Sequence, residues 1–181
     1  SCEACDAGKC QAQEQQAFCA VCEGGKYAAA AASIACDDCA VGEYSSAQAM
    51  LCDECGEGAV VTDSTGTTVV ALAGVKCVAC AKGKNAINST TDCTSCTAGQ
   101  YSGASGSTQC PLCSAGLYQP SEGQASCIGC TTGRYVVVQG ANSTADCAAC
   151  PSGRYQNEQA QSFCKGCTAG SKRNASDDAA A

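Results

Sequence analysis

Ten CxxC pairs run through this chain at a nearly constant interval, and they constrain its fold more than any other feature. Most successive pairs are 16 or 17 residues apart, and they begin at Cys2, Cys19, Cys36, Cys52, Cys77, Cys93, Cys110, Cys127, Cys147 and Cys164. Only Cys10 lies outside the pattern. Because self-similarity at a fixed period marks a repeat architecture, we expect one tandem array over residues 1–181. Its longer repeats span 52–76 and 127–146, and 171–181 are expected to form a flexible tail.

A glycine and a tyrosine follow the cysteines in register. The glycine comes three residues after the second cysteine of every pair, and in six repeats a tyrosine follows two residues later, at Tyr27, Tyr44, Tyr101, Tyr118, Tyr135 and Tyr155. The glycine is expected to form a turn with positive φ. The tyrosine ring is expected to cover a neighbouring disulfide while its hydroxyl stays in water. The chain would then return to the next CxxC as a short hairpin.

Two segments have strand propensity beyond this consensus. One is Tyr135–Val138, which is rich in valine. The other runs from Val60 to Val70, where Asp63–Gly66 reads as a turn between two β-rich runs and accounts for the longest repeat.

The rest of the composition leaves little for an ordinary core. Leu, Ile, Val and Phe together make up about a tenth of the chain, there is no Trp, and 21 residues are Cys. Small scaffolds without an apolar core use disulfides or metals instead. The net charge of −7 comes without a basic stripe, so we expect no nucleic-acid partner. No apolar run is long enough for a membrane span in this chain. Because the sequence starts at Ser1, a mature product or a fragment is expected.

The CxxCxxGxY consensus resembles the ephrin-receptor-like cysteine-rich repeat over nearly the whole chain. Similar arrays occur in ciliate immobilisation antigens, protozoan variant surface proteins and the mastigoneme proteins of algal flagella. The resemblance implies small disulfide-rich repeats in a protein that is extracellular or at the cell surface. With each repeat contacting its neighbours, we expect an elongated, solenoid-like rod of short β-hairpins with little regular secondary structure.

Tandem CxxC pairs are also typical of zinc sites, so a zinc-binding protein is the minor alternative. The chain has no His and is acidic, whereas zinc ribbons often combine His ligands with basic surfaces. Three N-x-S/T sequons, at Asn88, Asn142 and Asn174, point to the secretory route and are expected to carry glycans. We therefore expect oxidised cysteines, with no metal and no cofactor.

Cysteine connectivity cannot be proved from sequence. The pattern that fits hairpins best joins the second cysteine of each pair to the first of the next, and it resembles the closing element of epidermal-growth-factor-like modules. The expected bonds are Cys5–Cys19, Cys22–Cys36, Cys39–Cys52, Cys55–Cys77, Cys80–Cys93, Cys96–Cys110, Cys113–Cys127, Cys130–Cys147 and Cys150–Cys164. Cys2 would then take Cys10, and Cys167 would bond to a further repeat in a longer chain or a neighbouring subunit. A crossed pattern, first to first and second to second, stays open.

No catalytic residues are expected. The acidic residues are scattered, and redox enzymes carry one or two CxxC motifs in a βαβ setting rather than ten periodic copies. The leading hypothesis is a structural glycoprotein of an extracellular filament, surface coat or appendage. The alternatives are the stalk of a cell-surface receptor or adhesin, and a variable surface antigen. Its partners would be further copies of itself or other surface proteins.

Overall fold

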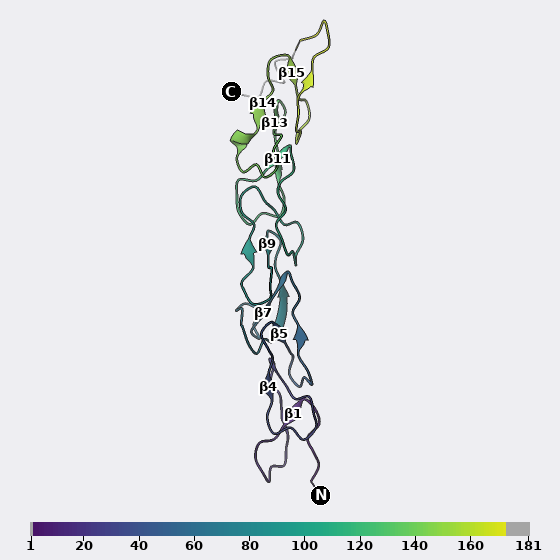
Figure 1. The fold of residues 1–181 in the computed structure, drawn as a ribbon, viewed down its shortest axis with the longest axis vertical. Coiled ribbons are helices and arrows are strands. Elements are labelled where there is room, and N and C mark those ends of the chain that lie inside the picture. The colour runs from purple at the N-terminus through teal and green to yellow at the C-terminus, as the bar shows by residue number, and fades with distance from the viewer. Residues whose placement is uncertain (1, 173–181) are drawn as a thin grey trace. The chain divides into compact units, whose positions relative to one another are not determined.

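The computed structural model describes residues 2–172 and divides them into two compact units. The first unit contains the residues up to Cys80 together with Ala86–Cys93 and Gly106–Thr108. The second contains Ala81–Asn85, Thr94–Ser105 and the residues from Gln109 onward. Most of the expected tail, 173–181, lies outside the described residues. As Figure 1 shows, most of the ribbon is loop, with very short strands.

Four antiparallel hairpins form the first unit. They pair β1 (Lys9–Cys10) with β2 (Ala20–Val21), β3 (Lys26–Tyr27) with β4 (Asp37–Asp38), β5 (Glu43–Tyr44) with β6 (Asp53–Glu54), and β7 (Ala59–Thr62) with β8 (Lys76–Ala79). Each sheet contains only its two strands. In Figure 1, β1, β4, β5 and β7 follow one another along this unit.

Four further hairpins belong to the second unit. They pair β9 (Lys84–Asn85) with β10 (Thr94–Ser95), β11 (Leu117–Tyr118) with β12 (Ile128–Gly129), β13 (Arg134–Tyr135) with β14 (Ala148–Ala149), and β15 (Arg154–Tyr155) with β16 (Lys165–Gly166). Between β13 and β14 lies a short 3₁₀ helix, η1 (Thr144–Asp146), capped by Ser143. The small disulfide-rich repeat fold expected from the sequence is therefore confirmed.

The register of these hairpins follows from the consensus. The first strand is formed by the two residues after the turn glycine, and the return strand is formed by residues next to or between the cysteines of the following CxxC. In the second hairpin, Lys26 pairs with Asp38 and Tyr27 with Asp37. The ten turn glycines have φ between +76° and +90°, which confirms the expected left-handed turn.

The two valine-rich segments behave differently. In the longest repeat, Val60 pairs with Val78 in the β7–β8 ladder, and the expected turn forms where Gly66 donates to the carbonyl oxygen of Asp63. At Tyr135–Val138 the expected strand is too long, because β13 ends at Tyr135. Val137 and Val138 are exposed, since the hairpin ladder covers only the two residues that face the next CxxC.

Candidate functional site

Nine disulfides hold the hairpins closed. Each joins the second cysteine of one CxxC to the first cysteine of the next, with Cα atoms 5.4–5.8 Å apart: Cys5–Cys19, Cys22–Cys36, Cys39–Cys52, Cys55–Cys77, Cys80–Cys93, Cys96–Cys110, Cys113–Cys127, Cys130–Cys147 and Cys150–Cys164. The structure thus brings together the eighteen cysteines in the successive order rather than the crossed one. In this order every bond closes one hairpin, including a ninth hairpin, between Cys96 and Cys110, whose arms meet only at the bridge between Gln100 and Leu112. Each repeat is therefore cross-linked locally.

Backbone hydrogen bonds join each repeat to the next within a unit. We call the position two residues after each turn glycine the aromatic position, because six repeats have tyrosine there. The amide of the turn glycine donates to the carbonyl oxygen of the residue that follows the aromatic position of the next repeat, as in Gly133 to Gln156 (2.7 Å) and Gly116 to Val136 (2.8 Å). The carbonyl oxygen of the same glycine accepts from the second cysteine of the next pair, as Gly116 accepts from Cys130 (3.0 Å). Both polar groups of the turn are therefore used to hold the following repeat.

In most hairpins, a second left-handed residue in the loop contacts earlier hairpins of the same unit. The amide of Gly123 donates to the carbonyl oxygen of Cys96 (2.7 Å), while its own carbonyl oxygen lies over the turn at Gly83. Ala160 repeats this arrangement with Cys130 and Gly116. A hairpin is thus fastened to both of the next two hairpins of its unit.

The aromatic position lies against the disulfide of the following hairpin. Tyr118 packs on the buried cluster that contains the bonded pair Cys130 and Cys147. Where asparagine replaces tyrosine, the Oδ1 atom of Asn85 lies 3.4 Å from the sulfur of Cys110, one hairpin further on. At Tyr118, the expected packing of a tyrosine ring on a disulfide is confirmed.

The residue after the aromatic position is buried in most repeats, which was not expected from the sequence. Gln119 and Gln156 are among these residues, with Ala28, Ser45, Ser102 and Val136. In Gln156, the side-chain amide donates to the carbonyl oxygen of Phe163 (2.8 Å), and its Oε1 accepts from the amide of Glu158 (3.1 Å). Because these residues share no chemical type, hydropathy could not reveal them. Their constant distance from the turn glycine was the only signal.

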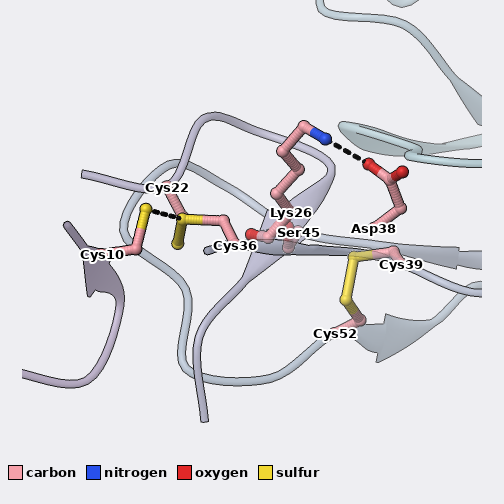
Figure 2. A network of polar contacts seen from close by, with 8 residues as sticks. All are labelled: Cys10, Cys22, Lys26, Cys36, Asp38, Cys39, Ser45 and Cys52. Carbon is pink, nitrogen blue, oxygen red and sulfur yellow. Dashed lines mark hydrogen bonds and ion pairs between the residues drawn. A yellow bond between two sulfur atoms is a disulfide. The ribbon is translucent and has the colours of Figure 1, made fainter. Parts of the chain in front are cut away.

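Three of the described cysteines carry free thiols: Cys2, Cys10 and Cys167. The expected bond between Cys2 and Cys10 is therefore wrong. Cys10 occupies the aromatic position of the first repeat, where the register directs its side chain to the following disulfide instead. Its sulfur lies 3.1 Å from the sulfur of Cys36, which is bonded to Cys22 (Figure 2). These three sulfur atoms all lie within 4.8 Å of one another.

Two sequon asparagines lie in exposed hairpin loops. Asn88 accepts hydrogen bonds at Oδ1 from the amides and hydroxyls of Thr90 and Thr91, at 3.0–3.1 Å. Asn142 directly precedes Ser143, the cap of η1, and its backbone amide donates to Asp146 (2.9 Å). Asn174 lies outside the described residues.

Hydrogen bonds and ion pairs shift the pKa of two charged side chains on the hairpin surfaces. Lys26 forms an ion pair of 2.5 Å with Asp38 across the second hairpin (Figure 2), and the bond to Asp38 raises the pKa of the lysine. In the longest loop, the hydrogen bond from Thr65 lowers the pKa of Asp63 to about 2. Among residues 2–172, no helix has the length and apolar character needed to cross a bilayer.

Comparison with known protein families identifies the type of repeat. The family described as tyrosine-protein kinase ephrin type A/B receptor-like matches residues 99–147. This range covers the bonds Cys113–Cys127 and Cys130–Cys147, and the same spacing of bonds continues on both sides of it. No curated protein matches the chain. The repeat is thus of the ephrin-receptor-like cysteine-rich type, and with the disulfides it points to an extracellular or cell-surface location.

Proposed function

From this ephrin-receptor-like repeat type and its disulfide series, we propose that the chain is a structural glycoprotein of an extracellular filament, surface coat or appendage. The observation that carries the proposal is the way in which the repeats are joined. Most turn glycines of the central repeats use both the amide and the carbonyl oxygen to hold the next repeat, as Gly99 does with Gln119 and Cys113. The cysteines of the consensus close each hairpin, and its turns bind that hairpin to the next one. A structural array needs such continuous links along its length.

The exposed apolar side chains support a role in association. Both phenylalanines are largely exposed, Phe18 at 84% and Phe163 at 56%, and so are Ile34 and Ile87 at 74% and 76%. More than half of the Leu, Ile, Val, Met and Phe side chains are exposed in this way. Single exposed apolar residues are common on monomers, but large apolar side chains are favoured at protein interfaces. We expect Phe18 and Phe163 to contribute to contacts with further copies or with other surface proteins.

Electron microscopy of the purified, glycosylated chain tests this proposal. We expect polymers whose formation increases with protein concentration. Phe163→Ser should shorten them while leaving the disulfides unchanged, and Gln159→Ser, an exposed polar change in the same hairpin, should leave them as they are. Dispersed single particles at every concentration would contradict the filament and coat functions.

The stalk of a receptor or adhesin is the second candidate. It uses the same interlocked repeats but needs no self-association, so it predicts dispersed particles in the same experiment. A variable surface antigen predicts instead that related chains keep the cysteines and turn glycines and differ in the exposed loops. The zinc-binding alternative predicts stoichiometric zinc together with many free thiols.

A further inference from the structure

The sulfur atoms of Cys10, Cys22 and Cys36 form a group that the structural role of the repeats does not require. Cys22 and Cys36 are bonded, and the thiol of Cys10 lies 3.1 Å from Cys36 (Figure 2). Among the described residues, this is the only group of three metal-ligating side chains that lie so close together. The other two free cysteines, Cys2 and Cys167, are not part of it.

The register of the repeat explains why this thiol is so close to a disulfide. The side chain two residues after a turn glycine lies against the disulfide of the next hairpin, as Tyr118 lies against Cys130–Cys147. In the first repeat this position is held by Cys10. The strand pairing agrees, since Cys10 pairs with Ala20 as Tyr27 pairs with Asp37. The register that packs the ring of Tyr118 on a disulfide therefore places the thiol of Cys10 beside a disulfide in the first repeat.

We propose that this group is a disulfide-exchange site, at which the Cys22–Cys36 bond converts to a Cys10–Cys36 bond. The thiol of Cys10 first loses its proton to water, because the thiolate is the attacking species. The thiolate sulfur then attacks the sulfur of Cys36, and a bond forms between them while the Cys22–Cys36 bond breaks. The electron pair of the broken bond stays on Cys22, which takes up a proton. The exchange needs no oxidant or reductant, because one thiol and one disulfide are present before and after it.

The exchange changes which thiol solvent can reach. Before it, the free thiol belongs to Cys10, which is partly buried. After it, the free thiol belongs to Cys22, which is 1% exposed. The hairpin from Cys22 to Cys36 loses its own closing bond and becomes tied to the first hairpin through β1. The site therefore has two states. In one, the Cys22–Cys36 bond closes its own hairpin and the thiol of Cys10 is partly exposed. In the other, a Cys10–Cys36 bond joins two neighbouring hairpins and the thiol of Cys22 is buried.

Disulfide mapping of the whole chain tests the proposal. The purified protein is incubated at pH 8 and quenched at timed intervals in acid denaturant, so that the shielded thiol of Cys22 can also be reached. Free thiols are then alkylated with a maleimide, and the protein is digested at acid pH. We expect peptides linked through Cys10–Cys36 to accumulate beside those linked through Cys22–Cys36, at a rate independent of protein concentration. Alkylation at Cys10 should fall as alkylation at Cys22 rises, and Cys2→Ser should not alter either rate. Absence of Cys10–Cys36 peptides from this wild-type protein would overturn the proposal.

Matched variants separate proximity from general reactivity. With Cys22→Ser, Cys36 should be recovered linked to Cys10. The control is Cys39→Ser, which frees Cys52 in the next hairpin. By the same register, the side chain that faces this bond from the preceding hairpin is Tyr27 rather than a thiol. There, Cys52 should stay alkylatable, and adding Tyr27→Cys to that variant should restore a bond to Cys52. Free Cys10 and Cys36 in a folded Cys22→Ser protein would also contradict the proposal, and if that variant does not fold, the wild-type measurement decides.

Discussion

Gly83 lies so close to the carbonyl oxygen of Gly123, in a hairpin two repeats further on, that a Cβ atom on Gly83 would be 2.0 Å from that oxygen. Gly83 also has φ of +80°, which side chains other than glycine rarely adopt. The turn glycine therefore serves two purposes, which are the left-handed turn of its own repeat and the close approach of another. The same contact recurs between Gly116 and Ala160.

Substituting two of these glycines separates the two purposes. We expect Gly83→Ala to destabilise its unit by more than the ~1–2 kcal/mol that a left-handed conformation costs an ordinary residue, because the new Cβ displaces the Gly123 backbone. Gly153→Ala should cost only the conformational part, since φ is +78° but no atom lies within 4 Å of the added Cβ. Hydrogen exchange of the amides in each hairpin measures both effects. Equal destabilisation by the two substitutions would mean that the close approach contributes nothing.

The buried glutamine of the last closed hairpin is expected to stabilise its loop. Gln156→Leu keeps the side-chain volume but removes the bonds to Phe163 and Glu158, and should cost about 1–3 kcal/mol. Gln11 makes the same two types of bond, to Phe18 and Gln13, but is only partly buried. Water can replace its lost partners, so Gln11→Leu should cost less. Urea unfolding of both variants measures the difference, and a larger effect at Gln11 would contradict this role of burial.

The longest loop should keep its structure at unusually low pH. The hydrogen bond from Thr65 is the main cause that lowers the pKa of Asp63 from 3.8 to about 2. A lowered carboxyl pKa stabilises the folded loop above the unfolded value and loses this contribution as pH falls through about 2. We expect NMR titration of the carboxyl carbon to show this low midpoint, and Thr65→Val to move it back toward 3.8. A midpoint near 3.8 in the unmodified chain would contradict the hydrogen-bonded loop.

The two described sequons are expected to carry N-linked glycans. Asn88 and Asn142 are both exposed in hairpin loops, where a glycan can project into solvent. Enzymatic glycan release in heavy-oxygen water should convert both to labelled Asp in protein from the secretory pathway. Asn157 is also exposed but has no sequon, and should stay Asn. If both sequon residues also stay Asn, the glycoprotein part of the proposed function fails.

The cysteine connectivity is open to direct chemical proof. We expect non-reducing digestion to yield a peptide linked through Cys113–Cys127, in the successive order. A peptide linking Cys110 to Cys127 would reveal the crossed order instead. This measurement is independent of the exchange at Cys10, which lies in a different part of the array.

The sequence alone determined the repeat, the turn and the hairpin. A CxxC at a fixed interval followed by glycine specifies where the chain must turn, because only glycine adopts φ near +80° without strain. It also predicted that the ring at Tyr118 would pack on sulfur, because a chain this poor in large apolar residues offers few other surfaces. The interpretation of Val137 and Val138 as strand failed for a related reason: local β propensity does not extend a ladder beyond the residues that the next CxxC can pair.

Only the tertiary structure decided which residues the repeats place together. The burial of Gln156 and the approach of Gly123 to Gly83 depend on how hairpins one and two repeats apart meet, and no pattern within a single repeat encodes these contacts. Cys10 is the sharpest case. In the sequence it is the odd cysteine near Cys2, but the register puts its sulfur beside Cys36, 26 residues away. Spacing along the chain determined the local turns, whereas the packing of one turn on another determined the neighbours of each side chain.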